Sequence, residues 1–199
     1  MKKGARMGFL SNLFGGKKTE VRKTTHEHPF HIENPTIGFL NLLGKDAAEV
    51  VAADTASLSP LFQDYRVSTD LPPRCQVLFI YCDIGSTGRI VGANKTLREL
   101  IKDAGAYVAV VASENDTEAY IKAMEGRNDW NANIVLSMDR NGEKFAEFFS
   151  KLFSAMFKGT SMLIAWVELV PQIPGYDHPD APGTIMAAEA GHIVFKRSG

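Results

Sequence analysis

The side chains best suited to chemistry in this sequence are acids that directly follow apolar segments. Three such segments are each followed by acids, which are Asp83, then Glu114 and Asp116, then Asp139. If the segments are parallel strands, these acids converge at one edge of the sheet. Mg²⁺ is commonly bound by one or two carboxylates together with phosphate oxygens, so Asp83 and Asp139 are the predicted metal ligands. The alternative is that these acids cap nearby helices, as Asp and Glu ordinarily do.

A loop of small residues follows the first of these apolar segments. Its sequence is Gly85-Ser86-Thr87-Gly88. Backbone amides of such a loop can bind phosphate, which makes Gly85, Ser86 and Gly88 candidate ligand-binding residues. The loop lacks both the glycine spacing of dinucleotide-binding turns and the Gly-Lys-Ser/Thr ending of a P-loop. An ordinary surface turn is therefore the alternative.

The two cysteines flank the same apolar segment. Cys75 and Cys82 are too far apart along an extended chain to form a disulfide, and free thiols favour a reducing, cytoplasmic setting. Cys82 could act as a nucleophile at the end of the strand, but no histidine is close to it in the sequence. We favour the alternative, a buried cysteine that packs as a small apolar residue. The sequence assigns no catalytic residue.

Residues 1–35 predict a basic, partly disordered tail, because lysine and arginine far outnumber acids in its first part. Residues 8–14 could form about two turns of amphipathic helix, and residues 7–18 could then make weak contact with an anionic membrane or a partner groove. A tail without regular structure is the alternative. His26, His28 and His31 are spaced closely enough for their side chains to bind zinc or nickel together. A histidine-rich linker is the alternative there.

Residues 36–69 predict a helical extension. Apolar residues such as Ile37, Leu40 and Leu43 recur at helical spacing, so one or two short helices are expected over 37–61. An extended connector is expected to follow, because two adjacent prolines precede the next apolar segment.

From residue 70 to residue 199, alternating patterns predict one α/β domain. Strands are expected at 77–82, 107–112, 133–138, 162–170 and 192–196, and helices at 93–104, 116–125 and 143–157. Thr184–Ala190 fits either a short helix or a hairpin with the last strand, and its alanines favour the helix. The alternation is typical of a three-layer α/β/α domain with a mainly parallel sheet of about five strands, flavodoxin-like or Rossmann-like.

Composition narrows the class of function. The formal net charge is -1, so no binding to nucleic acid is expected. No apolar run approaches the roughly 20 residues that span a bilayer. Together with the free thiols, these features predict a cytoplasmic protein.

The order of elements in the predicted α/β domain resembles the response-regulator receiver domain, which has a flavodoxin-like fold. The resemblance rests on three segments, LRELIKDAGAYVAVVASENDTEAYIKAM, NIVLSMDRNG and EAGHIVFK. The acidic pair of that family falls on Cys82-Asp83, where one acid is absent. The phosphoacceptor falls on Met138 or Asp139, and the lysine of the last strand falls on Lys196. The resemblance implies a degenerate receiver-like domain.

We therefore expect a regulatory or protein-interaction module without catalysis of its own. Its partner is expected to be another protein or further copies of the chain. The expected helix at 143–157 carries more phenylalanines than one buried face needs, so it is predicted to serve both core and interface. The alternative is a small enzyme, or a domain that binds Mg²⁺ or a nucleotide through the carboxylates and the glycine-rich loop.

Overall fold

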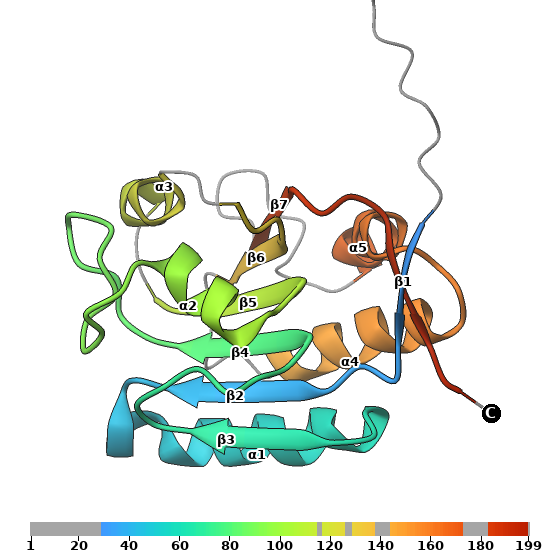
Figure 1. Cartoon of the computed structure of the whole chain (residues 1–199), viewed down its shortest axis with the longest axis horizontal. Coiled ribbons are helices and arrows are strands. Elements are labelled where there is room, and N and C mark those ends of the chain that lie inside the picture. Colours follow the sequence, from blue (N-terminus) through green and yellow to red (C-terminus); the bar gives the residue numbers. More distant parts are fainter. Residues whose placement is uncertain (1–28, 115–116, 126–128, 138–143, 173–182, 199) are drawn as a thin grey trace, which may run out of the picture.

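The structure is a computed structural model, and it describes residues 29–114, 117–125, 129–137, 144–172 and 183–198. Six strands in this part of the chain form one sheet. They are β2 (Ile37–Asn41), β3 (Tyr65–Ser68), β4 (Val77–Tyr81), β5 (Val108–Ala112), β6 (Asn133–Ser137) and β7 (Thr184–Ala188). Their order is β3-β2-β4-β5-β6-β7, and only β7 is antiparallel to its neighbour (Figure 1). A separate parallel pair joins β1 (Phe30–Glu33) to β8 (Ile193–Lys196).

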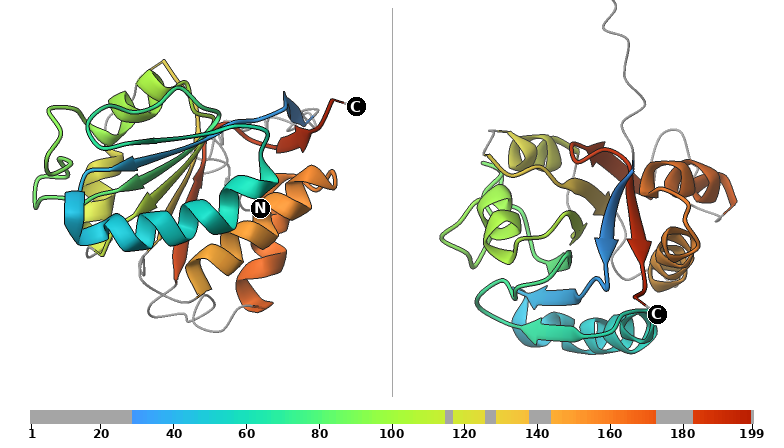
Figure 2. Two further views of the ribbon diagram at one scale, coloured as in Figure 1. Left: turned by 90° about the horizontal axis from the view of Figure 1, so that it is seen from below. Right: turned by 45° about the vertical axis from the view of Figure 1, so that its right-hand side comes forward.

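Helices cover both faces of the six-stranded sheet (Figure 2). They are α1 (Ala48–Leu58), α2 (Leu97–Ala104), α3 (Thr117–Met124), α4 (Lys144–Phe157) and α5 (Met162–Leu169). Short 3-10 helices lie at Gly44–Ala47, Ser59–Leu61 and Val170–Gln172. Buried residues of α1, α4 and α5 form one hydrophobic cluster with the sheet, and those of α2 and α3 form a second cluster.

The central strands are continuous apolar runs because both of their faces are covered. In β4, Val77, Phe79 and Tyr81 belong to the cluster of α1 and α4. Leu78 and Ile80 belong to the cluster of α2 and α3. All five side chains are fully buried. This pattern is typical of a parallel sheet between helical layers, and it explains why β4, β5 and β6 were predicted to within a residue.

The α2 helix shows how local signals set its ends. Thr96 and Glu99 form a reciprocal capping box, in which each side chain accepts a hydrogen bond from the other residue's backbone amide. Because this cap lies inside the predicted helix, α2 begins four residues later than predicted. Gly105 ends the helix with a left-handed φ of 70°, as predicted from its position.

Four of the five phenylalanines of α4 lie in the core. Phe145, Phe148, Phe149 and Phe153 are at most 1% exposed. The ring of Phe79 on β4 lies edge-on to Phe149, with 5.3 Å between ring centroids. These four side chains fill the space between α4 and the sheet, so they offer no surface to a partner.

The helix predicted at the start of the 37–61 segment is wrong, because residues 37–41 form the strand β2. All five residues of β2 are buried. A strand that is covered on both faces has no period of two, and its apolar positions then imitate helical spacing. Gly38 allows the close approach of the next segment, since a Cβ there would lie 2.6 Å from Cys75 Sγ. The second helix expected in this segment is confirmed as α1.

The predicted connector contains β3, an edge strand that pairs with β2. Together with β2, it places parts of the predicted helical extension in the same sheet as β4, and α1 packs against that sheet. The sheet therefore has six strands instead of about five. Residues 30–33, which were assigned to the tail, form β1.

Two predictions near the C-terminal part are also wrong. Met162–Leu169 forms the helix α5, and a strand was expected there. An eight-residue apolar run fits both structures, and the fully buried positions Met162 and Ala165 are three residues apart, as on one side of a helix. Thr184–Ala188 forms β7, which pairs with β6, so it is neither a helix nor a hairpin partner of β8.

Candidate functional site

The acids at the carboxyl edge of the sheet follow strands whose last residues pair with one another. Tyr81 pairs with Ala112, and Ala112 pairs with Ser137. Asp83 and Glu114 each lie two residues beyond their strand, and both are exposed. The two acids therefore follow neighbouring strands at matching positions along the strand direction. Both lie at the carboxyl edge of the sheet, as predicted from the parallel pattern.

Two of the predicted site residues, Asp116 and Asp139, lie outside the described residues. The meeting of Asp83 with Asp139 around Mg²⁺ therefore stays a prediction. Among the residues that the structure does describe, no group of three or more His, Cys, Asp or Glu side chains is positioned to hold a metal ion. His31 is exposed on β1, whereas His26 and His28 fall outside the described ranges, as do residues 7–18.

The glycine-rich loop folds as a small hairpin after β4. Ile84 and Ile90 form an antiparallel bridge. The amide of Gly85 donates to the carbonyl of Arg89, and the amide of Gly88 donates to the carbonyl of Gly85, both at 2.8 Å. These two amides are therefore engaged within the loop, so a phosphate would have to be bound by other donors.

Gly88 and Ser86 connect this loop to α3. Gly88 has a φ of 77°, and a Cβ at this position would lie 2.4 Å from the carbonyl carbon of Lys122. Only glycine fits such a close backbone contact. Lys122 Nζ also donates to the carbonyl of Ser86 at 3.1 Å. The loop's small residues thus have a packing role on α3.

The carboxyl ends of β2 and β4 lie side by side where the sheet changes its direction of winding. The chain passes from β2 to its neighbour β3, and then returns to add β4 on the other side of β2. In doubly wound sheets, ligands bind at such a crevice. Here the buried Asn41 side chain closes the loop after β2, since its Nδ2 donates to the carbonyl of Gly44 and its Oδ1 accepts from the amide of Leu43.

A buried polar pair lies beneath this edge. The hydroxyl of Tyr81 donates to Asp54 Oδ2 at 2.7 Å, from β4 to α1. Burial raises the pKa of Asp54 to about 6, and the hydrogen bond from Tyr81 partly opposes this rise. Burial and the neighbouring Asp54 carboxylate raise the pKa of Tyr81 well above its ordinary value. Sequence reasoning missed this pair because the helical pattern gives no sign that Asp54 faces the sheet.

Both cysteines are buried and form no disulfide with each other, as predicted. Burial raises the pKa of Cys75 to about 12, so its thiol is protonated at neutral pH. Cys82 is fully buried in the cluster of α2 and α3. These positions fit small apolar residues of the core.

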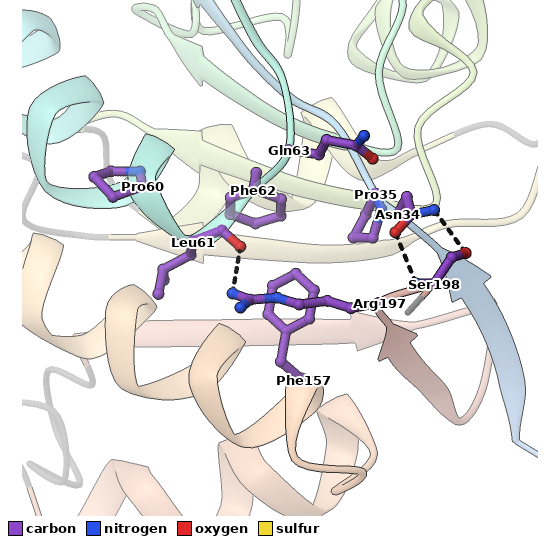
Figure 3. A pocket seen from close by; sticks show the side chains of 9 residues that line it. All are labelled: Asn34, Pro35, Pro60, Leu61, Phe62, Gln63, Phe157, Arg197 and Ser198. Atoms are coloured by element: carbon purple, nitrogen blue, oxygen red, sulfur yellow. Dashed lines mark hydrogen bonds between the residues drawn. The ribbon is translucent and has the colours of Figure 1, made fainter.

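A cavity that the sequence did not predict lies at the opposite, amino-terminal edge of the sheet (Figure 3). Its volume is about 400 Å³, and it is open to solvent. The lining residues come from segments far apart in the sequence, and they are Asn34, Pro35, Pro60, Leu61, Phe62, Gln63, Phe157, Arg197 and Ser198. No local pattern links these segments, so no sequence signal could have found this cavity.

No protein-family model matches this sequence, and no curated protein is significantly similar to it. Within the described ranges, none of the helices is long and apolar enough to cross a membrane. The functional conclusion therefore rests on the geometry of this chain.

Proposed function

We propose that this chain is a cytoplasmic regulatory or protein-interaction module without catalysis of its own, and that it associates through the outer edge of β3. The observation that carries the proposal is the exposure of this strand. Among the described residues, β3 pairs only with β2. The side chains of Tyr65 and Val67 are 53% and 52% exposed, whereas the central strands are completely buried.

The backbone of β3 is suited to pairing with an added strand. The amide of Ile37 on β2 donates to the carbonyl of Asp64 at 3.1 Å. Because alternate residues of a strand direct their backbone groups to opposite sides, Tyr65 and Val67 direct theirs away from β2. An unpaired row of amides and carbonyls of this kind is a template for β-strand addition.

Charge favours a second copy of the same chain as the partner. In an antiparallel pair centred on Tyr65, Asp64 lies opposite Arg66 of the second copy, and the twofold axis repeats this contact. The two Tyr65 rings then face each other across the axis. A pair centred on Arg66 would place two arginines opposite each other, which is unfavourable. In the single chain, Asp64 and Arg66 form only an exposed contact of 3.6 Å.

A charge reversal tests this pairing. R66D places two acids opposite each other and should weaken the dimer by about tenfold or more, measured by sedimentation equilibrium. The double variant D64R/R66D restores opposite charges and should restore the dimer. A monomeric wild-type protein would overturn the proposal, and a dimer unaffected by R66D would overturn this register.

The carboxyl edge supports a second candidate function, the binding of Mg²⁺ and a phosphate-containing ligand. Counted from β2, the order β3-β2-β4-β5-β6 agrees with the 2-1-3-4-5 order of flavodoxin-like sheets. On this count Asp83 follows the third strand and Ser113 follows the fourth, where the resemblance to the receiver family implies the phosphoacceptor and the hydroxyl residue. The assignments of the acidic pair to Cys82-Asp83 and of the phosphoacceptor to Met138 or Asp139 took β4 as the first strand, so this strand order replaces them. Lys196 lies on β8, outside the six-stranded sheet. Leu42-Leu43 follow the first strand, so the acidic pair that the resemblance implies is absent there. This arrangement supports a degenerate receiver-like domain.

Thermal unfolding with Mg²⁺, beryllofluoride and nucleotides tests the second candidate. A ligand at roughly a hundredfold above its dissociation constant should stabilise the protein by about 2.7 kcal/mol. The shift should disappear in Asp83→Asn and persist in the control Asp103→Asn, a half-buried acid on α2 whose carboxylate pairs with Lys95. A shift that survives in Asp83→Asn would remove Asp83 from the site, and the absence of any shift would remove the candidate function.

A further inference from the structure

The cavity at the amino-terminal edge has the size of a small-molecule site. Its volume of about 400 Å³ lies within the roughly 300–1,000 Å³ that is typical of such sites. Pro35 precedes β2, Gln63 precedes β3, and Phe157 is the last residue of α4. The cavity is therefore built at the ends of regular elements, which hold its walls in place.

Arg197 is the one charged side chain among the described residues that line this cavity. Its guanidinium carbon lies 4.8 Å from the centre of the Phe157 ring. One terminal nitrogen donates to the carbonyl of Leu61 at 3.1 Å, as the dashed line in Figure 3 shows. Stacking and this hydrogen bond hold the guanidinium in place and leave most of its five N–H donors for a ligand. Within the part of the chain that the structure describes, no carboxylate forms an ion pair with Arg197.

The remaining walls of the cavity divide into an apolar and a polar side. Phe62 is buried and lies edge-on to Phe157, with 5.6 Å between ring centroids. Pro35, Pro60 and Leu61 extend this apolar surface. On the polar side, Asn34 and Ser198 exchange two hydrogen bonds, from Asn34 Nδ2 to Ser198 Oγ at 2.8 Å and from the Ser198 amide to Asn34 Oδ1 at 2.9 Å.

We propose that this cavity binds a small monocarboxylate with a compact apolar body, and that Arg197 holds its carboxylate. A planar guanidinium matches a carboxylate through two parallel hydrogen bonds. The apolar body would lie against Phe62, Phe157 and Pro35. A phosphate fits less well, because the cavity presents a single cation to it beside an apolar wall. This proposal rests on neither the β3 pairing nor the carboxyl edge.

The test uses benzoate as the probe, with benzamide as its neutral analogue and inorganic phosphate as the competing anion. Binding is measured by calorimetry and by amide chemical shifts in NMR. Benzoate should bind at least about tenfold more tightly than either benzamide or phosphate, since only benzoate combines the carboxylate with the apolar ring. Amides at Asn34, Leu61 and Ser198 should shift.

The variant Arg197→Gln should weaken benzoate binding by about tenfold or more. Arg197→Lys keeps the charge but loses the planar fork, so it should also weaken binding. The matched control is Arg89→Gln, an exposed arginine at the opposite edge of the sheet, which should bind benzoate as the wild type does. Benzoate binding that is unchanged in Arg197→Gln, equal binding of benzamide or phosphate, or no binding of benzoate would each overturn the proposal.

Discussion

Replacement of Asp54 by Asn should make the protein more stable at neutral pH. It should also remove the part of the pH dependence of stability that arises from the Asp54 carboxyl. The Asp54 carboxyl is buried beneath β4, and folding raises its pKa from 3.8 to about 6. A carboxyl of this kind binds protons more tightly in the folded state, so its ionisation costs stability as the pH rises through this window. An Asn side chain has the same shape, carries no charge and can still accept the hydrogen bond from Tyr81.

The size of the effect follows from the change in pKa. Each pKa unit corresponds to about 1.4 kcal/mol, so a rise from 3.8 to about 6 corresponds to about 3 kcal/mol above pH 6. This is an upper value for the gain, because the NH₂ group of the introduced side chain is buried at the same site and needs a hydrogen-bond partner of its own. The wild type should regain this stability as the pH falls from about 6 to about 4.

Urea unfolding of the wild type and Asp54→Asn at a series of pH values measures this difference. The advantage of the variant should grow between about pH 4 and pH 6 and then remain constant. The control Asp46→Asn, an exposed acid in the 3-10 helix before α1, should follow the wild type. A difference between Asp54→Asn and wild type that does not change with pH would refute this explanation of the buried pair.

Three further predictions concern packing. Gly88→Ala should destabilise the protein by about 2 kcal/mol or more, because of the left-handed φ and the contact with the α3 backbone. Tyr120→Phe should lower the free energy of unfolding by about 1–2 kcal/mol, because the Tyr120 hydroxyl lies 2.8 Å from the buried carbonyls of both Ser113 and Ser137. Thr55→Val should raise the free energy of unfolding by about 1 kcal/mol, since the buried Thr55 hydroxyl has no hydrogen-bond partner among the described residues. Urea unfolding at constant pH measures all three, and opposite signs would contradict them.

The middle of the sheet could be predicted because its signals are local. The strands β4, β5 and β6 are short apolar runs, and each is followed by a helix with a recognisable face or cap. Thr96 and Gly105 mark the ends of α2 in the sequence itself. Such signals depend only on neighbouring residues, so they are visible without the structure.

The edges of the sheet could not be predicted in the same way. Gly38 in β2 weakens the strand pattern, and its reason is a contact with Cys75 that only the folded chain reveals. The strand β3 has exposed residues and few apolar neighbours, so it imitates a connector. The choice between helix and strand for Met162–Leu169 depends on packing against α4, which no local pattern encodes.

The same limit applies to the candidate sites. Asp83 and Glu114 lie at the same edge of the sheet because their strands are parallel, and the sequence predicted this placement. The cavity needs Gln63 and Arg197 to come together from distant segments, and the buried carboxyl needs Asp54 to face Tyr81. These are long-range contacts, so they were accessible only from the structure.

Amide hydrogen exchange in β3 tests the proposed association most directly. The Tyr65 amide points away from β2, and the Arg66 amide points toward it. As the protein concentration increases, exchange at Tyr65 should slow because a second copy covers this edge, whereas exchange at Arg66 should stay the same. An exchange rate at Tyr65 that does not depend on protein concentration would contradict the proposal that this chain pairs with itself through β3.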